Sequence, residues 1–68
     1  MNKENLFFEI VIFMTKVKED YKYNIISIDK YELIHIELSR LIDEIDNTDL
    51  LITLSKFHTI KTIYIIMK

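Results

Sequence analysis

The middle of the chain carries the clearest hydrophobic pattern. Apolar residues recur there at the three- and four-residue spacing of one helix face, namely Ile34, Leu38, Leu41, Ile42 and Ile45. Just before them, Asp29 can cap a helix, and Glu32 follows three residues later as in a capping box. The pattern predicts a helix over about residues 30–46, which the polar sequence DNTD then ends.

The segment 6–17 before this helix fits two patterns. As a helix it has one apolar face, but Ile10, Val11 and Ile12 are three β-branched residues in succession with phenylalanines around them. β-Branched and aromatic side chains favour strands. Segment 21–28 (YKYNIISI) alternates between two faces, as a strand does. Together the two segments predict a hairpin that turns at the charged sequence KED.

The C-terminal segment 50–68 contains eight β-branched residues and predicts a second hairpin, with strands at about 50–55 and 59–67. The expected fold class is therefore α+β. It is a small β-β-α-β-β domain with a four-stranded antiparallel sheet, and the central helix lies on one face of that sheet. The alternative is a three-helix bundle with helices at about 3–19, 30–46 and 49–67.

Length and composition point to a partner chain. Sixty-eight residues form a single small domain, 1–68, and a domain of this size buries only about 60% of its unfolded surface. Such domains are usually stabilised by a disulfide, a metal or another chain. The chain has no cysteine, which excludes disulfides and thiolate metal sites and fits a cytoplasmic protein. It also lacks glycine and proline, which excludes glycine-rich phosphate loops.

The predicted sheet has more apolar surface than one helix can cover. Both of its faces are apolar, whereas a sheet face in water is normally polar. The uncovered face is expected to form a protein interface through Phe7, Val11, Phe13, Tyr21, Tyr23, Ile25, Ile60, Tyr64 and Ile66. Because most soluble oligomers are symmetric, a homodimer is expected ahead of a different target protein.

Few residues suggest chemistry. The two histidines, His35 and His58, lack the partners of a zinc or nucleophile motif, and the acidic residues 43–49 lack the glycine and distal glutamate of a calcium loop. No catalytic residue, metal ligand or cofactor is predicted, and an enzyme is not expected. No segment reads as a signal peptide or a membrane span, so no membrane contact is expected.

Charge is unevenly distributed although the net charge is only −2. Residues 29–49 hold seven acids against two bases and predict an acidic docking face at Glu37, Asp43 and Glu44. Residues 50–68 hold three lysines and no acid, which predicts at most a weak anion contact at Lys56, His58 and Lys61. Nucleic-acid binding is not expected, because such affinity depends on many phosphate contacts.

These observations predict a small non-enzymatic protein-binding module. The expected form is a homodimer that acts as a stoichiometric regulator or inhibitor of a protein target. The Ile- and Lys-rich composition without glycine or proline is typical of low-GC bacteria and their phages or mobile elements. Two alternatives remain open, a nucleic-acid-binding accessory protein and a structural subunit of a larger complex.

Overall fold

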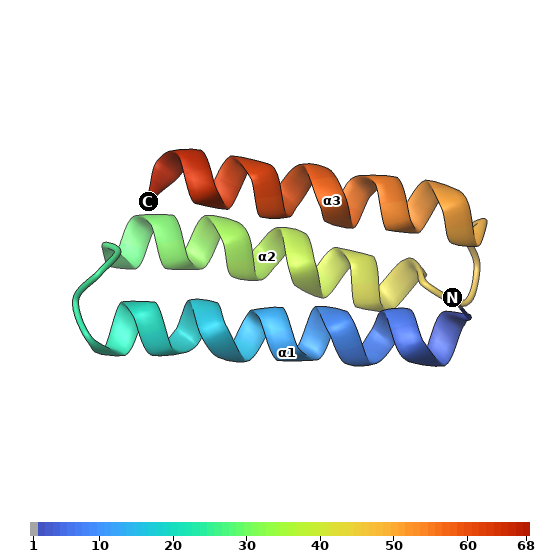
Figure 1. Cartoon of the computed structure of the whole chain (residues 1–68), viewed down its shortest axis with the longest axis horizontal. Helices are drawn as coiled ribbons and strands as arrows, with labels where there is room; N and C mark the ends of the chain where they lie inside the picture. Colours follow the sequence, from blue (N-terminus) through green and yellow to red (C-terminus); the bar gives the residue numbers. More distant parts are fainter. Residues whose placement is uncertain (1) are drawn as a thin grey trace.

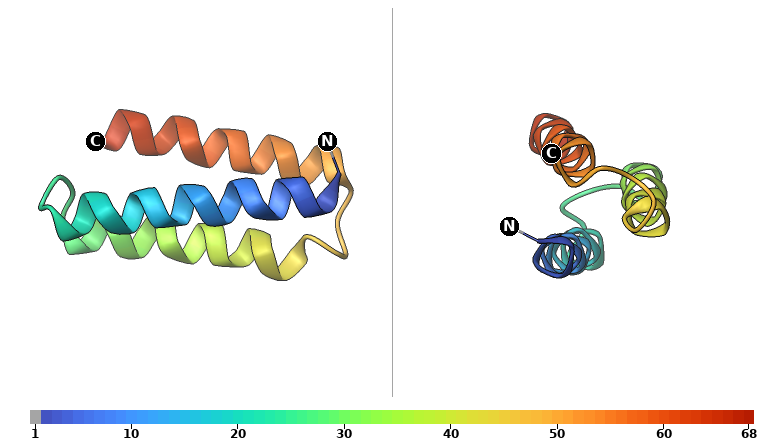
Figure 2. Two further views of the ribbon diagram at one scale, coloured as in Figure 1. Left: turned by 60° about the horizontal axis from the view of Figure 1, so that its bottom comes forward. Right: turned by 90° about the vertical axis from the view of Figure 1, so that its right-hand side faces the viewer.

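A computed structural model describes residues 2–68, and these residues form three helices in the order α1 (Lys3–Lys22), α2 (Ile28–Glu44) and α3 (Leu50–Met67). The helices run up, down and up, so α1 and α3 point the same way and α2 is antiparallel to both (Figure 1). Seen from the end, the three helix axes form a triangle (Figure 2). No strand occurs among residues 2–68.

Side chains cap the N-terminus of every helix. The Asn2 side-chain oxygen accepts a hydrogen bond from the backbone N–H of Asn5 at 2.8 Å. The Ser27 hydroxyl accepts a hydrogen bond from the backbone N–H of Lys30 at 3.3 Å. The Asp49 carboxylate accepts one from the N–H of Leu51 at 2.9 Å. These bonds satisfy amides that have no partner inside the helix. Polar residues in the sequence therefore set where each helix starts.

A Schellman motif ends α1 without any glycine. Asn24 takes a φ of 62°, in the left-handed region that asparagine tolerates better than most residues. Its N–H donates to the carbonyl of Tyr21 at 3.0 Å, and the N–H of Ile25 donates to the carbonyl of Asp20 at 2.8 Å. This pair of bonds defines the motif. Asn24 thus supplies the sharp turn that separates α1 from α2.

One stripe from each helix forms the core. The buried apolar residues are Leu6, Ile10, Val17, Ile26, Ile34, Leu38, Leu41, Ile45, Phe57, Ile60 and Tyr64. Between α1 and α3, the ring of Phe13 makes edge-to-face contacts with the Phe57 and Tyr64 rings, with centroids 5.8 Å and 5.5 Å away. Edge-to-face contacts of this kind add to the free energy of area burial. These aromatic rings fill the space between the two parallel helices.

The α+β prediction is wrong, and the structure matches the three-helix alternative. The three β-branched residues at 10–12 lie within α1, where Ile10 is fully buried and Ile12 is exposed. A β-branched residue costs a helix at most about 0.7 kcal/mol, which is less than the gain from burying one side chain in the core. Tertiary packing therefore overrides the local preference for strands.

The predicted hairpins are replaced by helix ends and turns. Residues 18–20 continue α1, and residues 21–28 contain its last turn, the connection and the start of α2. The predicted hairpin at 50–67 is the single helix α3. The central helix was expected at 30–46 and lies at Ile28–Glu44 because Ser27, not Asp29, is its N-cap.

Candidate functional site

The exposed surface of α3 carries large aliphatic side chains near both of its ends. The outer face of α3 is defined here by residues that are all exposed, namely Leu51, Ile52, Ser55, His58, Thr59, Thr62, Ile65 and Ile66. Leu51 is 73% exposed, Ile65 71% and Ile66 79%. Neither aspartate nor glutamate occurs in α3. The helix thus carries aliphatic side chains on its exposed side as well as on the side that the bundle buries.

The threonines of α3 hide their polar atoms. The Thr59 hydroxyl donates to the carbonyl of Ser55 at 3.1 Å, and the Thr62 hydroxyl donates to the carbonyl of His58 at 3.0 Å. Buried Thr53 bonds back to Asp49 in the same way, at 3.2 Å. Because each hydroxyl is satisfied inside its own helix, the methyl groups of Thr59 and Thr62 are left to contact a partner. The outer face therefore demands few new hydrogen bonds from whatever covers it.

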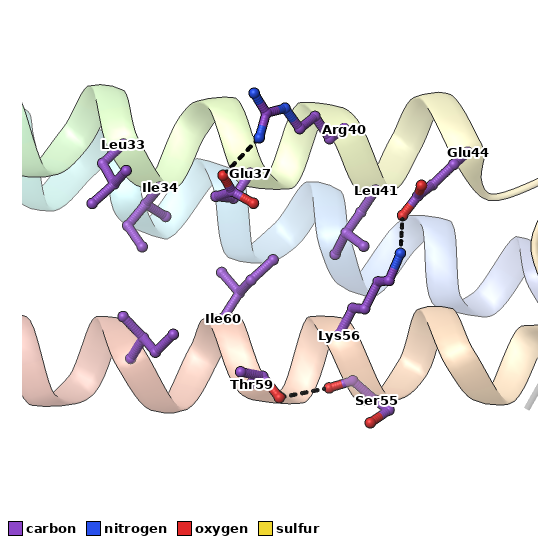
Figure 3. Close-up of a pocket in the computed structure, with 11 residues that line it drawn as sticks. Leu33, Ile34, Glu37, Arg40, Leu41, Glu44, Ser55, Lys56, Thr59 and Ile60 are labelled. Carbon is purple, nitrogen blue, oxygen red and sulfur yellow. Dashed lines mark hydrogen bonds and ion pairs between the residues drawn. The ribbon is translucent and has the colours of Figure 1, made fainter.

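The basic groups of α3 already have partners within the chain. Lys56 Nζ lies 3.0 Å from Glu44 of α2 (Figure 3). Lys61 Nζ stands 4.8 Å from the centre of the Phe57 ring, a cation–π contact. The structure brings His58 and Lys61 to one groove beside α1, whereas Lys56 lines the groove beside α2. The three residues predicted as an anion contact therefore do not lie together.

A shallow groove of about 630 Å³ runs between α2 and α3. Figure 3 shows apolar side chains from both helices meeting along its floor and two ion pairs along its rim. The apolar residues are Leu33, Ile34, Leu41, Ile60 and Ile63. Arg40 pairs with Glu37 at 3.0 Å, and Lys56 pairs with Glu44. The rim carries two charges of each sign, so it selects no single charge in a ligand.

Among residues 2–68, one carboxylate is buried, at the end of the bundle where α1 and α3 stop. Asp20 is 6% exposed and accepts hydrogen bonds from the hydroxyl of Tyr64 and from Lys68 Nζ, the latter at 3.0 Å. Bonding to Tyr64 lowers the pKa of Asp20, while burial acts in the opposite direction. Burial and the bond to Asp20 raise the pKa of Tyr64. The group ties the C-terminus of α3 to α1 and serves stability.

The predicted interface residues are spread over the molecule. Tyr64 and Ile60 are buried, and Phe13 is half-buried against them. The others are exposed but come from three places: Phe7, Val11 and Tyr21 from α1, Tyr23 and Ile25 from the connection after it, and Ile66 from α3. The predicted sheet that was to hold them on one face is absent from residues 2–68. Only Ile66 belongs to the outer face of α3.

The predicted acidic face lies on α2. Asp43 is exposed, whereas Glu37 and Glu44 are half-buried and engaged in the ion pairs of the groove rim. Sequence reasoning missed Asp20, which continues the helical spacing of Leu6, Ile10 and Val17 by three residues and could have been placed in the core on that ground. Residues 2–68 hold no group of three metal-ligating side chains.

By length and composition alone, α3 is apolar enough to cross a membrane. The 18 residues Leu50–Met67 have a mean hydropathy of 1.3, and the bundle buries 22% of them. One such helix is a weak indication, because core helices of soluble proteins meet the same criterion. The observation agrees with the exposure of the outer face of α3, which an environment other than water suits better.

No family model, curated protein or solved structure matches this chain.

Proposed function

We propose that this chain is a non-enzymatic helical interaction subunit, which acts by packing the outer face of α3 against another protein. The observation that carries the proposal is that α3 holds exposed aliphatic side chains and no acidic residue on the side that the bundle leaves uncovered. A helix of that composition belongs in a larger core or in a membrane. Of the roles predicted from the sequence, a structural subunit of a larger complex fits this helix best.

Exposed aliphatic side chains make covering the face favourable. Three of its residues, Leu51, Ile65 and Ile66, are each more than 70% exposed. Burying a large aliphatic side chain contributes about 1.5–3 kcal/mol. Exposed large apolar side chains that gather on one element mark interaction sites on soluble proteins. A protein partner is therefore the occupant that the composition of α3 favours.

The centre of the face favours protein over lipid or nucleic acid. Ser55, His58, Thr59 and Thr62 lie there, and helices that bind membrane surfaces instead present large apolar and aromatic side chains to the lipid. Lys56 and Lys61 are engaged within the chain, which leaves little free positive charge for phosphates.

Dye binding and light scattering test the proposal. We expect the chain to bind an apolar fluorescent dye when dilute, and Ile66→Lys to remove most of that signal without loss of helical circular dichroism. Ile36→Lys is the matched control, since Ile36 is 48% exposed on α2, and it should leave the signal nearly unchanged. A strictly monomeric chain that binds no dye would refute the proposed role.

A further inference from the structure

We infer that the outer face of α1 binds a second copy of this chain, packed antiparallel about a two-fold axis at the level of Phe13. The outer face of α1 is defined by six exposed residues, namely Glu4, Phe8, Val11, Thr15, Lys18 and Lys22. Because α1 and α3 lie at different corners of the triangle of helices, this surface is separate from the outer face of α3 (Figure 2). The inference therefore goes beyond the proposed function and does not rest on it.

Large apolar side chains are exposed on the first half of α1. Phe8 and Ile12 are each 62% exposed, and Phe7 and Val11 are 40% and 37% exposed. All four lie outside the stripe that the bundle buries in α1. The Thr15 hydroxyl donates to the carbonyl of Val11 at 3.0 Å, so it needs no hydrogen-bond partner in another chain. This half of α1 thus presents apolar and aromatic side chains, which the centres of protein interfaces favour.

The spacing along the outer face of α1 is the same in both directions. Its six residues are separated by 4, 3, 4, 3 and 4 positions, the alternation by which one helix packs along another in a coiled coil. Because this series is unchanged when it is reversed, an antiparallel copy brings each residue of the face level with another residue of the face. The level pairs are Glu4 with Lys22, Phe8 with Lys18 and Val11 with Thr15.

The two ends of the face carry opposite charges, and this complementarity selects an antiparallel second copy. Glu4 lies in the first turn of α1 and Lys22 in the last. The antiparallel pair sets Glu4 of each copy against Lys22 of the other, whereas a parallel pair sets acid against acid and base against base. Among residues 2–68, no ion pair includes Glu4, Lys18 or Lys22, so their charges are available to a partner.

The apolar side chains meet between these charged ends. Lys18 of the second copy lies level with Phe8, where its methylene groups and ammonium can cover the ring. In an antiparallel pair, each flank of one helix meets the same flank of the other. Ile12 therefore faces Ile12 of the second copy, and Phe7 faces its Tyr21, each within about 3 Å of the same level. The contact thus covers the large apolar side chains that α1 exposes.

The size of the contact sets the expected affinity. A helix of 20 residues is about 30 Å long. One pair of such helices buries less than the roughly 1,600 Å² of a standard interface. Association also costs translational and rotational freedom, so a contact of this size is weak. We therefore expect a dissociation constant of about 10–100 μM.

Charge exchange tests both the partner and the direction. Sedimentation equilibrium is measured between about 1 and 300 μM, a range that brackets the expected constant. The variants are Glu4→Lys, Lys22→Glu and the double variant that carries both changes. Asp29→Lys is the matched control, because Asp29 is an exposed acid in the first turn of α2 and the net charge changes equally. Circular dichroism checks that each variant keeps its helices.

The antiparallel dimer predicts that the two changes compensate each other. Either single change turns both unlike pairs into like pairs and should weaken dimerisation about fivefold. The double variant restores two unlike pairs and should return to within about twofold of the unchanged chain, as should Asp29→Lys. Single changes without effect would indicate a parallel pair or no contact through these residues. That result, or a double variant as weak as the single ones, would overturn the inference.

The apolar part of the contact is tested in the same assay. Ile12→Lys places two lysines beside the two-fold axis and should weaken dimerisation by about tenfold or more, whereas Ile36→Lys on α2 should leave it unchanged. Ile66→Lys, on the outer face of α3, should also leave it unchanged. Equal weakening by Ile66→Lys and Ile12→Lys would overturn the assignment to α1. A chain that stays monomeric at the highest concentration but binds dye through α3 would refute this dimer and leave the proposed function standing.

Discussion

The Tyr64→Phe substitution tests whether one buried hydrogen bond fixes the end of the bundle. Tyr64 is 2% exposed, and its hydroxyl donates to Asp20, which is 6% exposed. The change keeps the ring and its edge contact with Phe13 but removes the donor. A hydrogen bond to a charged group contributes about 1.5–3 kcal/mol. We therefore expect the free energy of unfolding at pH 7 to fall by about 2 kcal/mol.

The direction of the Asp20 shift gives this loss a pH dependence. Hydrogen bonding from Tyr64 holds the pKa of Asp20 below its ordinary value. A carboxyl whose pKa is lowered by folding stabilises the protein above its unfolded-state pKa of about 3.9. That contribution is lost as the pH falls through the lower folded-state pKa. Below that pH the bond joins two neutral groups, so the difference between the proteins should shrink to about 1 kcal/mol.

Urea unfolding followed by circular dichroism measures both quantities. The two proteins are compared between pH 7 and pH 2.5, and Tyr23→Phe is the control because Tyr23 is 69% exposed. The control should change the unfolding free energy by less than about 0.5 kcal/mol at every pH. A loss for Tyr64→Phe that stays constant across this range would show that the Asp20 charge takes no part in the stability of the bundle.

Five further substitutions test the caps, the core and the threonines. Ser27→Ala should cost about 1 kcal/mol in urea unfolding because it removes the N-cap of α2, and Asp29→Ala should cost less. Phe57→Ala should cost about 3–5 kcal/mol, whereas Leu51→Ala, on the exposed outer face, should cost less than about 1 kcal/mol in the same assay. Thr62→Val deletes a hydroxyl bonded only within its own helix, so the free energy of unfolding should change by less than about 0.5 kcal/mol. Equal costs within either of the first two pairs, or a loss above about 1 kcal/mol for Thr62→Val, would contradict the corresponding reasoning.

The sequence predicted α2 well because its pattern of apolar and charged residues fits a helix and does not fit a strand. Ile34, Leu38 and Leu41 follow the helical period, and charged residues occupy the other side, so no strand fits. In α1 and α3 apolar residues also occupy exposed positions, such as Ile12 and Ile65, so the sequence fits both the strand period and the helical period. The β-branched residues favoured the strand, and this choice was wrong because the free energy of packing exceeds the helix propensity differences between residues. The helical reading of these segments, kept as the alternative, was the one that packing selects.

The sequence also predicted that the chain has more apolar surface than it can bury, and this does not depend on the fold. Ile66 is an example, since it was assigned to an uncovered face and is 79% exposed on α3. Tyr64 was assigned to the same face and is buried, because the strand period places 64 and 66 on one side whereas the helical period separates them by about 200°. The amount of exposed apolar surface can be predicted from composition. Its location can be predicted only when the segment is correctly assigned as helix or strand.

The threonines and isoleucines of α3 explain both the wrong strand prediction and the exposed apolar surface of this helix. They favoured a strand in the sequence, yet in the helix Thr59 and Thr62 bond to their own backbone and present methyl groups outward. A face of isoleucine and threonine has few side-chain rotamers to lose when it is covered, because β-branched residues are already restricted. Leucine or lysine at these positions would suit a solvated helix better and would lose more entropy on packing. The same residues that obscure the helix in the sequence therefore make its outer face well suited to bind another helix.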